Sequence, residues 1–151
     1  MNESSLNNIG KSRDVLFIIS SIIFNISVSL IYVTTKFNNS IFQLIAGITV
    51  ILLIVPFSIV LVGYLRVKEE KKIIISLAVI LFYLIFELSL DYILRIPFRD
   101  ILSLHILYIV IFYAAEFSMI GIAFDKNKKM GFVLLVTFGI LLGCLVYLYI
   151  G

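Results

Sequence analysis

The chain has 151 residues, of which 62% are hydrophobic and 14% are charged, and its formal net charge is +3. Soluble domains are about 45–50% apolar and about 25% charged, so this composition excludes an ordinary soluble domain and predicts an integral membrane protein. The 12 Lys and Arg residues fall in short clusters between apolar runs, which indicates membrane topology and argues against a nucleic-acid partner.

Five apolar runs are each long enough to cross a hydrocarbon core of about 30 Å as a helix. Short segments rich in Asn, Pro and charge separate them, as expected for turns at the water interface. After a polar cytoplasmic tail, 1–14, the sequence therefore predicts one all-α transmembrane domain, 15–151, in a multi-pass protein of the cell membrane. The expected spans of this helical bundle are residues 15–35, 41–65, 73–94, 101–124 and 130–150.

The distribution of positive charge predicts the orientation of these spans. Nine Lys and Arg residues lie before the first run, after the second or after the fourth, and three lie on the opposite side. By the positive-inside rule, the N-terminus is expected in the cytoplasm and the C-terminus outside. An arrangement of four or six spans would remove this bias, so the charges support five spans independently of hydropathy.

The first two runs contain polar or helix-disrupting positions near the expected middle of the membrane. Ser21, Asn25 and Ser29 recur every four residues on one face of the first run. The serine hydroxyls are expected to bond back to their own helix, and Asn25 is a candidate partner for a polar group at that depth. In the second run, Pro56 is expected to free a backbone carbonyl one turn earlier, near Leu52.

Charged residues gather at the end of the third run. Tyr83, Glu87, Asp91 and Arg95 recur every four residues, so a continuous helix would place them on one face, and Arg99 follows shortly after. Ionisable residues inside a membrane are costly and mark functional sites by default. The alternative is a structural staple, in which the two arginines and the histidine neutralise the acids and close the turn.

The fourth run carries a matching stripe that includes His105, Tyr108 and Glu116. Because the short RIPFR turn makes the third and fourth runs antiparallel neighbours, we expect Glu87 and His105 to lie close enough in depth to pair. For His105 we favour a role as a hydrogen-bond partner over a role as a metal ligand or a catalytic base. Glu116 is about 20 Å from the outer face at 1.5 Å per residue, with no basic residue at its depth, and is the strongest functional candidate.

The fifth run is mostly apolar, with Gly139 and Gly143 in a GxxxG spacing that predicts a face for close helix packing. The single cysteine, Cys144, excludes a disulfide within the chain and a CxxC redox centre, and one histidine excludes sites that need two. We therefore predict no cofactor, no metal site and no catalytic residue.

Three functions remain open. In the first, the protein is a transporter or transporter subunit whose intramembrane carboxylates exchange protons or bind a cation or small solute, and it works as a homo-oligomer or with a membrane partner subunit. In the second, it is a non-catalytic accessory, assembly or immunity-type subunit. The third and weakest is a membrane-embedded enzyme with a Glu–His pair. The residues of the predicted pathway are Glu116, Glu87, Asp91, His105, Asn25, Tyr83 and Tyr108, with Arg95 and Arg99 as supporting charges.

We favour transport slightly over the accessory role, and both over an enzymatic function. A carrier is expected to have its carboxylates facing a hydrated cavity, whereas a structural role predicts carboxylates capped by neighbouring side chains.

Overall fold

The computed structural model describes residues 2–150, which contain helices and no strand. Met1 and Gly151, at the ends of the predicted tail and of the predicted transmembrane domain, lie outside these residues. All five predicted spans are confirmed as helices that are long and apolar enough to cross a membrane. They are α1 (Glu3–Lys36), the pair α2 (Ser40–Leu52) and α3 (Ile54–Arg66), α4 (Lys71–Glu87) with the π-helical segment η1 (Leu88–Ile93), α5 (Leu102–Lys126) and α6 (Lys128–Tyr149).

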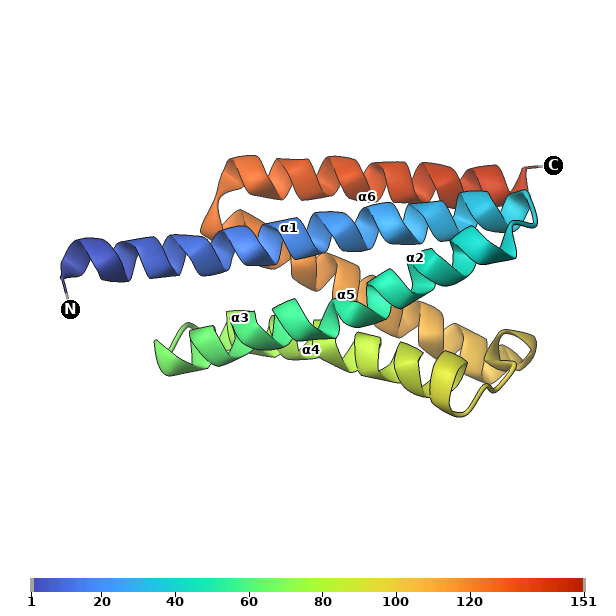
Figure 1. The fold of residues 1–151 in the computed structure, drawn as a ribbon, viewed down its shortest axis with the longest axis horizontal. Coiled ribbons are helices and arrows are strands. Elements are labelled where there is room, and N and C mark those ends of the chain that lie inside the picture. Colours follow the sequence, from blue (N-terminus) through green and yellow to red (C-terminus); the bar gives the residue numbers. More distant parts are fainter. Residues whose placement is uncertain (1, 151) are drawn as a thin grey trace.

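The helices run side by side as a bundle, and the two ends of the chain lie at opposite ends of it (Figure 1). This placement is the one expected for an odd number of crossings. Helix α1 packs against α6, α2 and α3, and α4 packs against α5. The polar residues predicted as a tail continue α1 as helix from Glu3, so α1 extends beyond the other helices at its N-terminal end.

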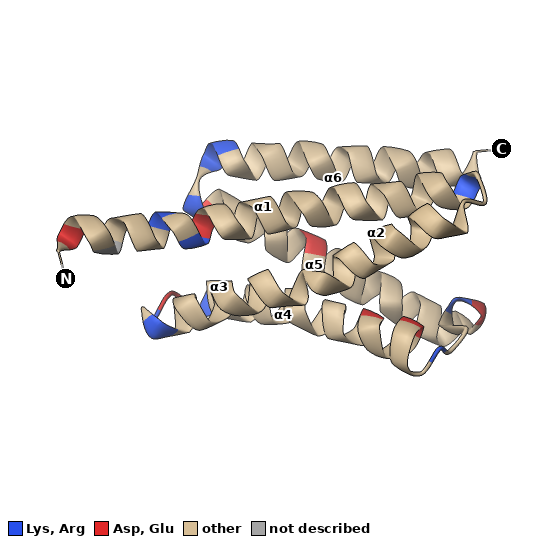
Figure 2. Ribbon diagram, viewed as in Figure 1, with Lys and Arg blue, Asp and Glu red and all other residues tan. Residues whose placement is uncertain are grey.

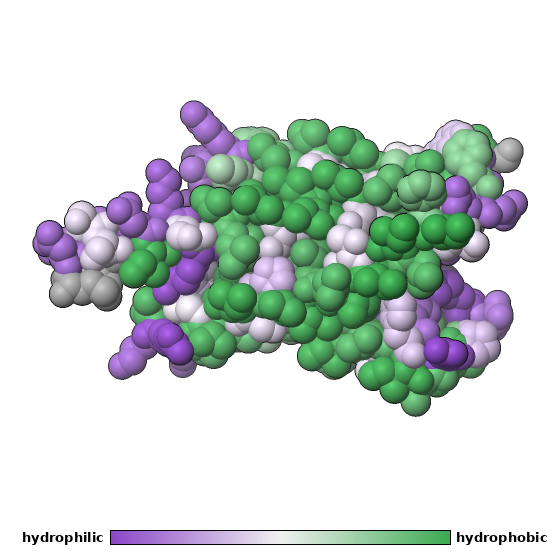
Figure 3. All heavy atoms as spheres, viewed as in Figure 1, coloured by the Kyte–Doolittle hydropathy of each residue, from purple (hydrophilic) through white to green (hydrophobic). Residues whose placement is uncertain are grey.

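Apolar side chains cover the outside of the bundle as well as its inside. Aromatic residues such as Phe17 and Phe57 fill the interior, with ring centroids 5.9 Å apart. On the surface, a hydrophobic band lies between two hydrophilic ends (Figure 3). Soluble monomers rarely expose apolar patches larger than a few hundred Å², so a band of this extent fits contact with lipid chains.

The second span is interrupted at Leu53, between α2 and α3. Pro56 has no N–H group to donate to the carbonyl of Leu52, and its ring crowds that carbonyl. The chain compensates with a tighter bond from the Leu53 N–H to the oxygen of Val50, 3.2 Å, and α3 resumes with a bond from Phe57 to Leu53, 3.1 Å. The interruption therefore lies where the proline predicts it.

The third span ends differently from the continuous helix that the sequence predicts. After Glu87 the backbone widens into η1, and the N–H of Leu94 bonds to the oxygen of Ser89 at 2.8 Å, five residues earlier. Arg95 then adopts a φ of 50°, and the Ile96 N–H caps the helix at 3.0 Å from Leu90. The predicted four-residue stripe therefore does not extend to Arg95, which lies beyond the helix.

Ion pairs join the helix ends on the side of the α3–α4 turn. Lys126 at the end of α5 lies 2.9 Å from Glu69 in that turn and 4.0 Å from Asp14 of α1. Lys72 of α4 lies 3.0 Å from Asp125. Figure 2 shows how the charged residues gather at the two ends of the bundle. These pairs hold α1, α4 and α5 together at one end.

Candidate functional site

A carboxyl group, an amide and a hydroxyl meet in the interior, each from a different helix. Glu116 on α5 has no exposed surface, and Asn25 on α1 is 1% exposed. One polar atom of the Asn25 amide lies 2.8 Å from Oε1 and 3.1 Å from Oε2 of Glu116. The other lies 2.8 Å from Oγ1 of Thr137 on α6. We call these three residues the inner cluster.

The inner cluster lies away from the charged ends of the bundle. Glu116 is a buried residue of α5 (Leu102–Lys126), more than two turns from either end of that helix, whereas Figure 2 shows most Lys, Arg, Asp and Glu residues toward the two ends of the bundle. Among residues 2–150, no ion pair includes Glu116. The polar neighbour of Glu116 is therefore the neutral amide of Asn25.

The Asn25 amide can serve either protonation state of Glu116. A carboxylate only accepts hydrogen bonds and therefore pairs with the amide NH₂ group, whereas a carboxylic acid can donate to the amide oxygen. In the second case the NH₂ group donates to Thr137, whose hydroxyl donates to the backbone oxygen of Leu134 at 2.9 Å. A half-turn of one amide thus lets the cluster hold or release a proton while the carboxyl group keeps a partner.

A cavity of about 170 Å³ between α1 and α6 reaches the hydroxyl end of the inner cluster. Its walls are apolar apart from Ser29, Thr137 and Cys144, and Glu116 does not line it. The cavity therefore connects Thr137 with the apolar outer surface of the bundle, while the carboxyl group stays enclosed.

A second group, which we call the outer cluster, consists of Tyr83, Glu87 and Tyr108. The Tyr83 hydroxyl donates to Oε2 of Glu87 at 3.0 Å and lies 2.9 Å from the Tyr108 hydroxyl. Either hydroxyl can donate in the bond between the two tyrosines, so the chain can run in the direction that suits an ionised or a protonated Glu87. Glu87 is 8% exposed, so both predicted carboxyl groups are buried and capped by neutral side chains.

An aromatic layer separates the two clusters. Tyr108 and Glu116 are about 12 Å apart along α5 at 1.5 Å per residue. Between these levels, the Phe112 ring lies 6.2 Å from that of Phe24 and 5.5 Å from that of Tyr83, centroid to centroid. Phe24 and Phe112 are both buried. Buried aromatic rings therefore fill the space at the level between the two clusters.

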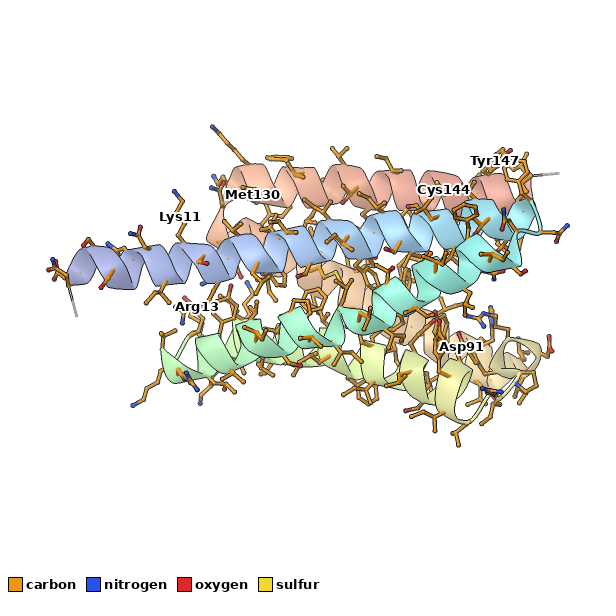
Figure 4. All side chains as sticks on the ribbon, viewed as in Figure 1. Lys11, Arg13, Asp91, Met130, Cys144 and Tyr147 are labelled. Atoms are coloured by element: carbon orange, nitrogen blue, oxygen red, sulfur yellow. The ribbon has the colours of Figure 1, made fainter. Side chains whose placement is uncertain are left out.

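Asp91 and Arg99 form a two-bonded ion pair beside the outer cluster. The guanidinium donates to the two carboxylate oxygens at 3.1 and 3.2 Å and lies over the rings of Phe98 and Tyr108. Burial by itself disfavours the charged guanidinium, but the hydrogen bonds to Asp91 and its charge outweigh burial, so the pKa of Arg99 lies above its usual value. Figure 4 shows Asp91 near the α4–α5 connection.

Two predicted contacts of this region are absent from the described residues 2–150. Arg95 is exposed and forms no ion pair, so Arg99 alone neutralises Asp91. His105 is not bonded to Glu87, and its buried Nδ1 has no hydrogen-bond partner. Tyr108, one turn farther along α5, lies in the place that the sequence predicts for the histidine. The predicted Glu–His pair is therefore not formed.

The predicted serine stripe of α1 and the predicted glycine face of α6 have different environments. Ser21 and Ser29 bond back to their own helix, at 2.9 Å from the Phe17 oxygen and 2.7 Å from the Asn25 oxygen, as expected. Gly139 and Gly143 face open space, with no atom of the described residues within 4 Å of an added Cβ. Among residues 2–150, the GxxxG face thus makes no close contact.

Sequence reasoning missed Thr137 as a partner of Asn25. The signal was present, since Thr137 and Cys144 are the main interruptions of an otherwise apolar span.

Within residues 2–150, no three His, Cys, Asp or Glu side chains are grouped so that they could hold a metal ion. Comparison of the chain with protein-family models, curated proteins and solved structures found no match.

Proposed function

We propose that the protein is an integral membrane carrier, or a subunit of one, in which Glu116 exchanges a proton or binds a cation or small solute. The observation that carries the proposal is the inner cluster: a fully buried carboxyl group without a basic partner, held by an amide that can pair with it in both protonation states. Ionisable groups at such depth line ion pathways and proton relays in many membrane proteins.

The outer cluster extends this proposal. Glu87 is joined to Tyr83 and Tyr108 in a line of hydrogen bonds at the level of the Asp91–Arg99 pair. In a carrier, Glu87 would take up the proton or solute near the outer surface and pass it to Glu116 when the aromatic layer moves. The described conformation then corresponds to an occluded state, with both carboxyl groups closed off.

Proton flux into liposomes tests the proposal. Purified protein is reconstituted, a pH gradient and a membrane potential are applied, and a trapped pH-sensitive dye reports the flux. We expect wild type to move protons and Glu116→Gln to lose the flux, because Gln keeps the size and hydrogen bonding of the side chain but cannot release a proton.

Glu70→Gln provides the matched control, because Glu70 is exposed and the chemical change is the same. It should move protons as wild type does, and the yield of monodisperse protein in detergent reports folding of each variant. Equal flux from wild type and Glu116→Gln, or no flux from wild type, would contradict proton-coupled transport.

A non-catalytic accessory subunit is the second candidate, and two observations favour it. Both carboxyl groups are capped by neutral side chains, and the Gly139–Gly143 face of α6 is free to receive a helix of another protein. This function predicts that Glu116→Gln accumulates less than wild type in the membrane while neither protein moves protons. The enzyme hypothesis receives no support from the geometry, since His105 and Glu87 are not bonded.

A further inference from the structure

A groove of about 900 Å³ lies between the N-terminal part of α1 and the last turns of α3. Its volume is in the range of small-molecule sites, about 300–1,000 Å³. The groove combines two guanidinium groups at one end with aliphatic walls. The residues that matter for the argument are Arg13, Ser58, Ile59, Val62, Gly63 and Arg66.

Arg13 is held in position against α3. Its side chain extends from α1 toward α3, whereas Lys11 points to the other side of α1 (Figure 4). One terminal nitrogen donates to the backbone oxygen of Gly63 at 3.0 Å, while the buried Nε has no partner among the described residues. Gly63 makes this approach feasible, because a Cβ there would collide with Cδ of Arg13.

The charges of Arg13 and Arg66 are not neutralised within the described residues, where neither forms an ion pair. Asp14 follows Arg13 in the chain, but its carboxylate accepts a bond from the Tyr64 hydroxyl at 2.8 Å and faces Lys126. The groove therefore has an excess of positive charge and free guanidinium donors, which suit a phosphate group.

The rest of the groove is apolar and lies along a surface suited to lipid. Ile59 and Val62 are 55% and 47% exposed. From Arg66 to Ser58 the groove follows α3 for about 12 Å at 1.5 Å per residue, toward the middle of the span. A soluble phosphate ion would occupy only the charged end and leave these aliphatic walls uncovered.

We propose that this groove binds one anionic phospholipid, with its phosphate held by Arg13 and Arg66 and an acyl chain lying along Ile59 and Val62. Basic pockets between transmembrane helices on the cytoplasmic side are suited to anionic headgroups. The groove lies at the end of the bundle that the positive-inside rule predicts to be cytoplasmic. The inference does not depend on transport, because it uses no residue of the inner or outer cluster.

Native mass spectrometry of the full chain tests the proposal. The protein is released from detergent micelles that contain phosphatidylglycerol or phosphatidylcholine with the same acyl chains. Wild type should retain one phosphatidylglycerol in preference to phosphatidylcholine. Arg13→Gln and Arg66→Gln should each weaken phosphatidylglycerol retention about fivefold, the effect of one basic residue near an anionic lipid.

Two further variants separate this site from general surface charge. Lys128→Gln/Lys129→Gln removes two positive charges at the same end of the bundle but away from the groove, and should retain the lipid as wild type does. Gly63→Ala keeps every charge yet displaces Arg13, and should weaken retention about as much as Arg13→Gln. Circular dichroism and monodispersity in detergent confirm folding, and Arg66→Gln tests the site at an exposed position if Arg13→Gln does not fold.

Three results would overturn the proposal. Equal retention of the two lipids by wild type would show that the groove does not select a negative headgroup. An equal loss from the lysine control would assign binding to overall charge. Displacement of phosphatidylglycerol by inorganic phosphate at low millimolar concentration would identify a free anion as the ligand.

Discussion

The contact between Asn25 and Glu116 allows the packing of the inner cluster to be tested quantitatively. Asn25 supplies the amide atom that lies 2.8 Å from Oε1 of Glu116, in a site with no exposed carboxyl surface. A buried polar group that loses its partner costs about 1–3 kcal/mol. We therefore expect Asn25→Leu to lower the free energy of unfolding by about that amount.

The double variant Asn25→Leu/Glu116→Met should lose less free energy of unfolding than the sum of the losses in the two single variants. When both partners become apolar groups of similar shape, no buried polar atom is left without a bond, and the replacement can be nearly neutral. The coupling between the two positions should be on the order of 0.6–1.7 kcal/mol, the average and upper values for hydrogen bonds between membrane helices.

Unfolding by SDS in mixed micelles, followed by circular dichroism, measures all four proteins. A second cycle with Ser21→Ala and Glu116→Met is the control, because the Ser21 hydroxyl bonds to the Phe17 oxygen of its own helix. This control should be additive. Additivity of the Asn25–Glu116 cycle as well, within about 0.3 kcal/mol, would refute the reasoning.

Three further predictions use the same unfolding measurement. Arg99→Gln should cost about 1 kcal/mol because it breaks a two-bonded ion pair, whereas Arg95→Gln should stay within about 0.5 kcal/mol. Gly47→Ala should destabilise more than Gly139→Ala, because its methyl group would displace the hydroxyl end of the Tyr92 side chain, whereas Gly139→Ala adds a methyl group into open space. Tyr108→Phe removes the hydroxyl that bonds to Tyr83 in the outer cluster and should cost about 0.5–1.5 kcal/mol. Equal effects within either matched pair, or a stabilising Tyr108→Phe, would contradict these assignments.

The number and extent of the helices could be predicted because they depend on local properties of the chain. A span needs about 20 apolar residues, and the sequence contains five such runs. The interruption near Leu53 follows from the missing N–H of Pro56, which is also a local property. No feature of the sequence predicts the π-helical segment η1. The prediction of one helical stripe with four-residue spacing was therefore wrong in including Arg95.

Contacts between helices were harder to predict, because they depend on the path of the connections. The chain between η1 and α5 contains a 3₁₀ turn, Phe98–Asp100, with Phe98 buried, and is not a tight turn. A change of one turn in register is enough to place Tyr108, in place of His105, beside the bonded pair of Tyr83 and Glu87. The sequence did indicate one contact between helices, since Asn25 of the first span was expected at a depth similar to that of Glu116.

Infrared difference spectroscopy of the protein in lipid tests the central proposal, that Glu116 gains and loses a proton while enclosed in the bundle. Spectra are recorded across a pH change for wild type, Glu116→Gln and the control Glu70→Gln. The proposal predicts a carboxylic-acid C=O band that changes reversibly with pH, is present in the control and is absent from Glu116→Gln. A wild-type spectrum without such a band, or one in which Glu116→Gln keeps it, would contradict proton exchange at this residue.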